Sequence, residues 1–565
     1  MRMRPPIIWS IAGLDTAGGA GLSADQRAAD ALGVHLCPVV ACLTAQNSQG
    51  VEAIFPIEPE QLEAQLDALS RDLPPRVIKT GLLGNIAVIE VVVRWIDKLR
   101  AQAPEGVEPH QQLAVVVDPV WRASAGGAGF SNEAIREAYR AHLLPRATVV
   151  TPNRIEAQTW LGRTDAPLPE LARQLRSQGA RSVVITGGDT PMLPASSGQT
   201  GWCLDWVDAP HADGWLCAPR IDTPHHHGTG CTFATGVAAA LAHGHAEADA
   251  IVLASMLTRH ALMHARQAGQ GSGPVVAQAG FAAGVAAGGA PLPWLGIGEA
   301  LPWLLQDSAP PGGPPESPSS GPSSGPLFQP HQPPPDGLYA ILPDANLLGV
   351  AVQAGLRCVQ LRHKPAEGLD AELQSSLQAC AEAGATLFVN DHWRAALAQP
   401  LPERPRPGFQ LGLHLGQEDL LALTPADQAL LRSQRHRVQL GLSSHSLWEL
   451  ARAAGCGASL IACGPVQPTT TKDMPWQPQG EVNLRWWVAH SPAPVVAIGG
   501  LLSEDELTRF AACGPASLCV VRALGAHAQE VRERAPPLRA AVAAGRQRQG
   551  QPSAGGATGL PHPVL

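Results

Sequence analysis

The chain has 565 residues, 45% of them hydrophobic, which is enough material for at least two separate cores. A formal net charge of −8 argues against the basic surface of a nucleic-acid-binding protein, and we expect neither a signal peptide nor a membrane span. Eleven cysteines without CxxC or metal-ligand spacing are typical of reduced thiols, so we expect a cytoplasmic protein.

Residues 1–306 are predicted to form an α/β sheet of mainly parallel strands. Short apolar runs alternate there with stretches of helical composition, which is the order that such a sheet requires. The predicted strands cover residues 7–12, 34–40, 77–78, 113–117, 148–150 and 182–185. Because ligands of these sheets bind beyond the carboxyl ends of the strands, we expect Asp118 and residues 151–153 and 187–189 at the site.

A glycine-rich motif, His227-Gly228-Thr229-Gly230-Cys231, precedes an alanine-rich helical stretch. The glycines allow a sharp turn, after which the free N–H groups of the helix start point at one spot. Such a spot stabilises the charge that develops on a transferred phosphoryl group. A residue at the helix start can act as a base toward a hydroxyl, and a thiol there is expected to have a lowered pKa. The motif is also compatible with a helix start that carries no chemistry.

Residues 307–336 separate the two halves of the chain. This segment holds eleven prolines, six serines and four glycines, and such a composition cannot bury enough apolar surface to offset its ordering entropy. We interpret it as a flexible linker between bodies at 1–306 and 337–550. Residues 551–565 are expected to form a disordered tail.

The second body contains eight apolar runs at nearly regular spacing, most of them separated by stretches of helical composition. They cover residues 337–342, 358–361, 386–389, 410–415, 438–442, 459–462, 495–498 and 517–521. Eight strand–helix units in about 210 residues predict a TIM (β/α)₈ barrel.

Charged residues follow the carboxyl ends of these strands, where barrel enzymes assemble their active sites. The chain has only four lysines, and two of them, Lys364 and Lys472, lie there. Their ammonium groups suit a large anion, whereas Asp391 and Asp419 offer oxygens to Mg²⁺. The Gly499-Gly500 pair offers backbone N–H groups to a smaller phosphate. The pattern predicts a site for a pyrophosphate leaving group and a phosphorylated nucleophile.

The motifs of the first body resemble those of the hydroxymethylpyrimidine/phosphomethylpyrimidine kinases, which have a ribokinase-like three-layer α/β/α fold. The similarity runs from residue 7 to about 265 and rests on the glycine-rich motif and on residues 12–15, 18–21, 45–47, 79–83, 118–120 and 151–157. It implies that Cys231 is the catalytic base and that Gly228 and Gly230 bind phosphate. It also implies further site residues: Gly13, Asp25, Gln46 and Leu82 for the pyrimidine, and Asp118 and Glu156 for Mg²⁺ and the phosphates. Two departures, Thr186 and Arg122, fall among the expected ATP-phosphate contacts.

Residues 337–525 resemble thiamine-phosphate synthase in residues 360–364, 388–391, 414–420, 468–472 and 497–500. The resemblance implies that Arg362, Lys364, Asn390 and Lys472 bind pyrophosphate, with both lysines catalytic. Asp391 and Asp419 would bind Mg²⁺. The substrate contacts that it implies are Gln360 and Ser443 for the pyrimidine, and Thr469, Thr471 and Gly500 for the thiazole phosphate. Arg522 replaces the serine that the family carries after its eighth strand.

Both resemblances together predict a bifunctional enzyme of thiamine biosynthesis. The first body would use MgATP to phosphorylate 4-amino-5-hydroxymethyl-2-methylpyrimidine and then its monophosphate. The second body would condense the resulting pyrophosphate with hydroxyethylthiazole phosphate, releasing thiamine phosphate and pyrophosphate. The expected partners are these small molecules, without nucleic acid or membrane. Whether the protein forms a homo-oligomer through the kinase domain stays open.

Three alternatives also stay open. The first body is compatible with a pyridoxal-type vitamin kinase. It is compatible as well with a non-catalytic pyrimidine sensor that has lost its phosphate contacts through the Thr186 and Arg122 changes. The second body is compatible with a thiazole tautomerase-like barrel, although that enzyme has no need of a lysine-rich pyrophosphate site.

Overall fold

The computed structural model describes residues 4–102, 104, 106–121, 132–188, 201–306, 326–365, 367–469, 475–549 and 559–565. These residues form two compact units. The first comprises Met1–Leu301 with Gly556–Pro563, and the second comprises Pro302–Gly555 with Val564–Leu565.

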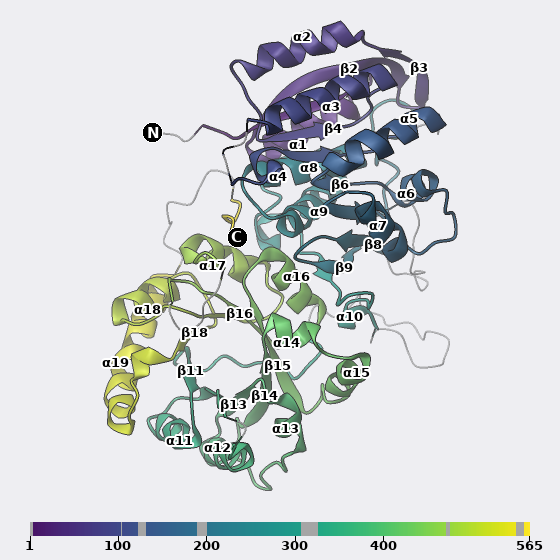
Figure 1. Cartoon of the computed structure of the whole chain (residues 1–565). Coiled ribbons are helices and arrows are strands. Elements are labelled where there is room, and N and C mark those ends of the chain that lie inside the picture. The colour runs from purple at the N-terminus through teal and green to yellow at the C-terminus, as the bar shows by residue number, and fades with distance from the viewer. Residues whose placement is uncertain are drawn as a thin grey trace. The chain divides into compact units, whose positions relative to one another are not determined.

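The first unit is a ten-stranded sheet with helices on both faces (Figure 1). Its strands are β1 (Ile7–Leu14), β2 (His35–Asn47), β3 (Gly50–Pro56), β4 (Val77–Thr80), β5 (Ala114–Val117), β6 (Val149–Val150), β7 (Ser182–Ile185), β8 (Trp202–Asp208), β9 (Asp213–Pro219) and β10 (Trp294–Leu295). Its helices are α1 (Gly21–Leu32), α2 (Pro59–Ser70), α3 (Ile86–Arg100), α4 (Pro109–Gln112), α5 (Glu133–Ala138), η1 (Tyr139–Leu143), η2 (Leu144–Arg146), α6 (Arg154–Leu161), α7 (Leu168–Ser177), α8 (Thr229–Ala242), α9 (Glu247–Met263) and η3 (Val285–Ala287).

The strands of this sheet follow the order β10-β9-β8-β7-β6-β5-β4-β1-β2-β3. The six strands from β7 to β2 are parallel, and they are the six that the sequence predicted. The antiparallel strands β3, β8, β9 and β10 were not predicted. Only β3 and β10 lie at the edges of the sheet, whereas β8 and β9 have neighbours on both sides.

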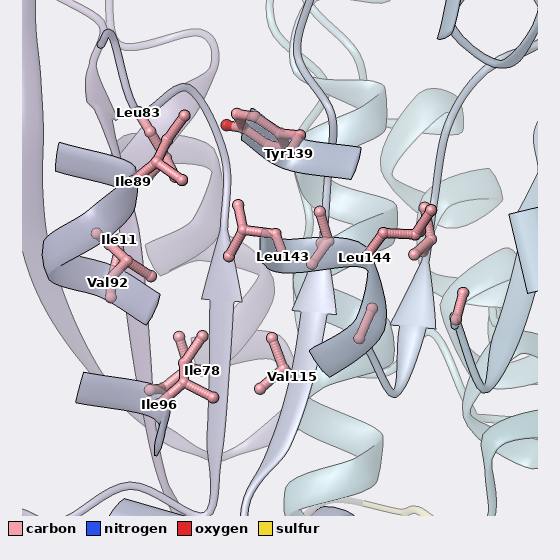
Figure 2. Packing of buried hydrophobic residues seen from close by; sticks show 14 of the residues in the cluster. Ile11, Ile78, Leu83, Ile89, Val92, Ile96, Val115, Tyr139, Leu143 and Leu144 are labelled. Carbon is pink, nitrogen blue, oxygen red and sulfur yellow. The ribbon is translucent and has the colours of Figure 1, made fainter. Parts of the chain in front are cut away.

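Alternate residues of the central strands face opposite helix layers. Helix α3 carries an apolar stripe of Ile89, Val92 and Ile96 at helical spacing, and this stripe packs on Ile78 and Val115 of the sheet (Figure 2). Helices α1, α8 and α9 pack together over the opposite face, with α8 against β1, β4 and β5. The first unit therefore has the predicted three-layer α/β/α arrangement.

The second unit is a closed barrel in which each parallel strand pairs with the next and the eighth pairs with the first. Its strands are β11 (Leu338–Leu342), β12 (Cys358–Leu361), β13 (Thr386–Asn390), β14 (Gln410–Leu415), β15 (Val438–Ser444), β16 (Leu460–Cys463), β17 (Val495–Ala497) and β18 (Ser517–Val520). Its helices are α10 (Trp303–Gln306), α11 (Ala345–Gln353), α12 (Leu369–Ala383), α13 (Trp393–Ala398), α14 (Gln417–Leu421), α15 (Pro425–Ser433), α16 (Leu447–Gly455), α17 (Gly480–His490), α18 (Glu504–Ala511), η4 (Arg522–Leu524) and α19 (Ala528–Gln547). All eight predicted strands are present, and the prediction of a TIM barrel is confirmed.

The second half of the predicted linker packs on the barrel. Phe328 is 2% exposed, the Leu327 N–H donates to the Gly457 carbonyl at 2.9 Å, and the Gln329 N–H donates to the Val438 carbonyl at 3.1 Å. His331 Nδ1 lies 2.9 Å from Gln439 Oε1. The prediction of a flexible linker therefore does not hold for residues 326–336, because the apolar side chain of Phe328 is buried there. Residues 307–325 lie outside the described residues.

The tail also differs in part from the prediction. Pro561 and Val564 are buried, so the prediction of a disordered tail does not hold for residues 559–565. Residues 551–558 lie outside the described part of the chain. Within the described residues, no helix has the length and apolar character needed to cross a membrane.

Candidate functional site

The first unit encloses a cavity of about 970 Å³ beyond the carboxyl ends of its central strands. Residues from the predicted pyrimidine and phosphate sets meet on its wall although they come from distant parts of the chain. They are Gly13, Gln46, Leu82, Asp118, Glu156, Gly228, Gly230 and Cys231.

Helix α8 begins at this cavity. Gly228 has φ of 86° and lies so close to the loop after β1 that an added Cβ would sit 2.2 Å from the Gly19 carbonyl oxygen, so only glycine fits there. A Cβ on Gly230 would meet no atom within 4 Å. The first-turn N–H groups of an α-helix have no intrahelical partners and carry the positive end of its dipole. The start of α8 is thus suited to bind a phosphate.

Cys231 retains partial exposure at this helix start, and the Gly21 N–H donates to its sulfur. Burial raises the pKa of this thiol to about 12, and the nearby Lys79 ammonium offsets only part of the rise. The predicted lowering of the thiol pKa is therefore wrong, because loss of hydration outweighs the positive charges.

A buried hydrogen-bonded group joins the loop after β1 to the glycine-rich motif. Asp15 accepts from the N–H groups of Gly19 at 2.9 Å and Ala20 at 2.8 Å, and its Oδ2 lies 3.1 Å from His227 Nε2. The same His227 nitrogen lies 3.2 Å from Gln46 Nε2. Although burial alone would raise it, these hydrogen bonds hold the pKa of Asp15 below its usual value. The sequence analysis included these residues in its motifs but did not predict their contact.

Asp118 and Glu156 both line the cavity. Burial raises the pKa of Asp118 to about 6 against the lowering effect of Lys79, and Asp118 Oδ2 is buried without a hydrogen bond, 3.8 Å from Lys79 Nζ. Glu156 accepts from the N–H of Asn153 at 2.9 Å. Carboxylate oxygens of this kind fit a hard cation such as Mg²⁺.

Asp25 is the predicted pyrimidine contact that the structure places elsewhere. Its side chain is 0% exposed and is absent from the cavity wall, and its oxygens accept hydrogen bonds from Ser10, Lys79 and Thr235. Both oxygens are thus already bonded to β1, β4 and α8, and the contact of Asp25 with the pyrimidine stays a prediction. Of the two departures from the kinase pattern, Thr186 lines the cavity and Arg122 lies outside the described residues.

In the second unit, the end of β12 places a buried glutamine inside the barrel mouth. The Tyr339 hydroxyl donates to Gln360 Oε1 at 2.7 Å, and Gln360 Nε2 donates to Asn390 Oδ1 at 2.9 Å. This chain fixes the orientation of the Asn390 amide at the end of β13. Two predicted residues, one for the pyrimidine and one for the pyrophosphate, are therefore in direct contact.

Ser443 at the end of β15 lies beside buried polar groups of β14 and α14. His414 Nε2 is 3.0 Å from Ser443 Oγ, and Gln417 Nε2 donates to the Ser443 carbonyl at 2.7 Å. Burial first, and the charge of Arg362 second, lower the pKa of His414 to about 4, so this imidazole is neutral at physiological pH.

The two predicted metal ligands follow neighbouring strands, Asp391 directly after β13 and Asp419 within α14 after β14. Asp391 has φ of 63°, and it is the non-glycine residue with positive φ among those described. Such strain is typical of functional positions. Asp419 Oδ2 accepts from the Gly416 N–H at 3.1 Å. No group of three or more His, Cys, Asp or Glu side chains in the described part of the chain forms a ready metal site.

The remaining predicted residues lie on the loops of the same rim. Lys364 is exposed and Thr469 is half-buried. Gly500 has φ of 75°, and an added Cβ would lie 2.4 Å from Gln467 Cβ. Thr471 and Lys472 lie outside the described residues.

Comparison with known families gives one match in each unit. The family model described as phosphomethylpyrimidine kinase matches residues 15–276. The model described as thiamine monophosphate synthase matches residues 339–524.

Individual relatives match one unit or both. A hydroxymethylpyrimidine/phosphomethylpyrimidine kinase of Synechococcus elongatus is 39% identical over 276 residues, covering 48% of this chain and 97% of that protein. The solved ADP complex of Bacillus subtilis pyridoxal kinase is 28% identical and covers 48% of this chain and 96% of its own, with a TM-score of 0.41. A probable thiamine biosynthetic bifunctional enzyme, chloroplastic, of Oryza sativa subsp. japonica is 30% identical over 517 residues, covering 88% of this chain and 82% of that protein. The chain therefore belongs to the family of bifunctional thiamine biosynthetic enzymes, which join a hydroxymethylpyrimidine/phosphomethylpyrimidine kinase to a thiamine-phosphate synthase.

Proposed function

We propose that the cavity of the first unit brings the hydroxymethyl group of the pyrimidine to the terminal phosphate of ATP. The observation that carries this proposal is the start of α8, where Gly230 leaves open space beside Cys231 in the same cavity as Asp118 and Glu156. Gly13, Gln46 and Leu82 line the part assigned to the pyrimidine. The N–H groups of Gly228 and Gly230 are assigned to the transferred phosphoryl group.

The transfer moves one phosphoryl group and one proton. The hydroxyl oxygen forms a bond to the terminal phosphorus, the bond from that phosphorus to the ADP oxygen breaks, and the hydroxyl proton passes to the sulfur of Cys231. Base action requires the thiolate form, which burial disfavours and which Lys79 and the start of α8 favour. Asp118 and Glu156 would hold Mg²⁺, which neutralises phosphate charge when bound.

The base assignment is tested by Cys231→Ala and by the pH dependence of the wild-type rate. Loss of a positioned base lowers kcat by about 100-fold or more. Because the thiol pKa is raised to about 12, the thiolate fraction and hence the kinase rate should rise with pH throughout the alkaline range. Cys513→Ala, in the other unit, is the matched control. A kinase rate that is unaffected by Cys231→Ala would contradict the assignment.

For the second unit we propose that the barrel rim binds the pyrimidine pyrophosphate and the thiazole phosphate. Arg362, Lys364, Asn390 and Lys472 are assigned to the pyrophosphate. The assigned substrate contacts are Gln360 and Ser443 for the pyrimidine, and Thr469, Thr471 and Gly500 for the thiazole phosphate. The Gln360–Asn390 hydrogen bond supports this assignment, because it joins a pyrimidine residue to a pyrophosphate residue.

The condensation breaks one bond and forms one. The methylene C–O bond breaks, its electron pair leaves with pyrophosphate, and the thiazole nitrogen lone pair forms the new C–N bond. The ammonium and guanidinium groups stabilise the departing charge. Asp391 and Asp419 would hold Mg²⁺, which shares that charge when bound.

Replacement of Lys472 by alanine tests whether the two sites are separable. Thiamine phosphate formation should be abolished, while ATP consumption with the pyrimidine continues unchanged. Lys364→Ala should behave in the same way. A variant that loses both activities would contradict separate sites. Comparing ATP turnover with the pyrimidine and with pyridoxal tests the substrate of the first unit.

We also propose that the enzyme works in a reducing compartment such as the cytoplasm. All eleven cysteines are free, as is typical of proteins kept under reducing conditions. Equal activity of the purified enzyme with and without a thiol reductant, but a loss on oxidation, would support this.

A further inference from the structure

One buried carboxylate in the first unit joins four elements. Asp25 of α1 accepts from Ser10 of β1 at 2.6 Å, from Lys79 of β4 at 3.0 Å to each oxygen, and from Thr235 of α8 at 2.8 Å. Thr235 follows Cys231 by one helical turn, so both side chains lie on the same side of α8. Asp25 therefore attaches the phosphate-binding helix to the sheet next to its functional end.

Lys79 is a lysine without exposure to solvent. Its side chain is 0% exposed, and its ammonium lies 3.0 Å from Asp25 and 3.8 Å from Asp118. An added Cβ on Gly81 would sit 3.2 Å from Lys79 Nζ, so the glycine of this loop leaves room for the ammonium. Lys79 also lines the cavity and interacts electrostatically with Cys231.

Burying the Asp25–Lys79 ion pair costs desolvation free energy, and the packing of the core does not require such a pair. Desolvation of two charges often exceeds their attraction, and apolar residues of similar volume stabilise a core equally well or better. The pair is also unusual for this chain, which has four lysines among forty basic residues. A compact ammonium, held at one point, suits a site where negative charge develops.

We propose that Asp25 and Lys79 are positioning residues for phosphoryl transfer and that neither contacts the pyrimidine. Asp25 holds the start of α8 against the sheet and keeps the Lys79 ammonium in place. Lys79 then acts as a fixed positive charge below Cys231, where it favours negative charge on the sulfur and on the transferred phosphoryl group. The inference rests on the function proposed for the start of α8.

Several charged or titratable groups from the surrounding elements act on this thiol or on its neighbours. They are Asp25 and Arg27 of α1, Lys79 of β4, and Asp118 after β5. Lys79 and Asp25 have opposite charges, so their removal should change the reactivity of Cys231 in opposite directions. A purely structural role would not produce opposite signs.

The experiment measures alkylation of Cys231 by iodoacetamide at one fixed alkaline pH in the full-length enzyme, with modified peptides quantified by mass spectrometry. Lys79→Met should slow the alkylation about tenfold, because the thiolate fraction falls about tenfold when the thiol pKa rises by one. Asp25→Asn should accelerate it by a similar factor. Lys98→Met is the matched control, since Lys98 lies over the Trp95 ring, 3.8 Å from its centroid and away from the cavity, and it should leave the alkylation rate unchanged.

Kinase kinetics on the same variants separate positioning from substrate binding. Both substitutions should lower kcat by about 100-fold, the typical loss for one preorganised electrostatic group, and leave KM for the pyrimidine unchanged. Thiamine phosphate formation by the second unit should stay normal and serves as the folding control. Wild-type kinase activity, measured alongside, tests the proposed function separately.

Each single substitution leaves a buried charge without its partner. The double variant Lys79→Met/Asp25→Asn removes both charges and so avoids this effect. It should alkylate at a rate between those of the single variants and keep the kcat loss. Alkylation shifts of the same sign in both single variants, or no shift in either, would overturn the proposal. A rise in KM for the pyrimidine with kcat preserved would also overturn it, since it would assign Asp25 to the substrate.

Discussion

In the first unit, charged groups at the cavity are paired with one another, and Lys79 lies within 4 Å of both Asp25 and Asp118 with no exposure to solvent. In the second unit, Lys364 stands exposed on the loop after β12. A site that moves one phosphoryl group needs a fixed field, whereas a site that binds a whole pyrophosphate needs cations that the ligand itself neutralises. In the roles proposed for them, a buried and an exposed lysine thus serve phosphate chemistry in distinct ways.

The largest expected effect concerns the stability of the second unit. Phe328→Ala removes a side chain that is 2% exposed and whose ring lies 6.2 Å from that of Trp303. The cavity left behind should lower the free energy of unfolding of the barrel by about 3 kcal/mol or more. Urea unfolding followed through thiamine phosphate formation measures it, with kinase activity as the internal reference.

Leu421→Ala, at a position 46% exposed in the same unit, is the control and should cost less than about 0.5 kcal/mol. Equal effects of the two substitutions would mean that residues 326–336 do not belong to the barrel core.

The second prediction separates space from backbone strain at the glycine-rich motif. Gly230→Ala places a methyl group in the open cavity, so stability should change by less than about 1 kcal/mol while kinase kcat falls about 100-fold. Gly228→Ala should instead destabilise the first unit, since its φ is 86° and the added Cβ overlaps the Gly19 carbonyl. Thermal unfolding and kinase assays on both variants provide the comparison. Full kinase activity of the Gly230→Ala variant would contradict the assignment of the phosphate to the start of α8.

The third prediction compares the acid sensitivity of the two units. Burial lowers the pKa of His414 to about 4 and that of His245 to about 3, whereas an unfolded histidine titrates near 6.5. The unfolded chain thus binds more protons below pH 6.5, so stability is complete above that pH and falls as the pH decreases toward 4. Each histidine should contribute a loss of about 1.4 kcal/mol per pH unit at most.

His414→Gln should weaken the pH dependence of synthase inactivation and leave the pH dependence of kinase inactivation unchanged. Thermal inactivation of the two activities between pH 7 and pH 5 is the measurement. An unchanged pH dependence in the variant would show that His414 is not the responsible group.

The smallest effect is expected from shortening the proline-rich segment. Helix α10 and residues 326–336, which flank this segment in the sequence, belong to the same compact unit. Deletion of residues 310–321 should therefore leave both activities unchanged and alter stability by less than about 1 kcal/mol. A selective loss of one activity would favour the interpretation of this segment as a linker between the two catalytic bodies.

The sequence by itself determined the parallel strands of the first sheet, the eight strands of the barrel and the residue types at their carboxyl ends. Those features depend on local apolar patterns and on short motifs, which neighbouring residues encode. It did not determine the antiparallel strands, the packing of Phe328, or the hydrogen bonds that Asp25 makes to β1, β4 and α8.

Tertiary structure decided these points because each depends on contacts between residues far apart in the chain. Thr235 lies 210 positions from Asp25. Phe328 packs beside Trp303, and the next residue, Gln329, bonds to the start of β15. The raised pKa of Cys231 has the same origin. A helix start predicts a lowered thiol pKa, and only the folded environment shows that lost hydration is the stronger effect.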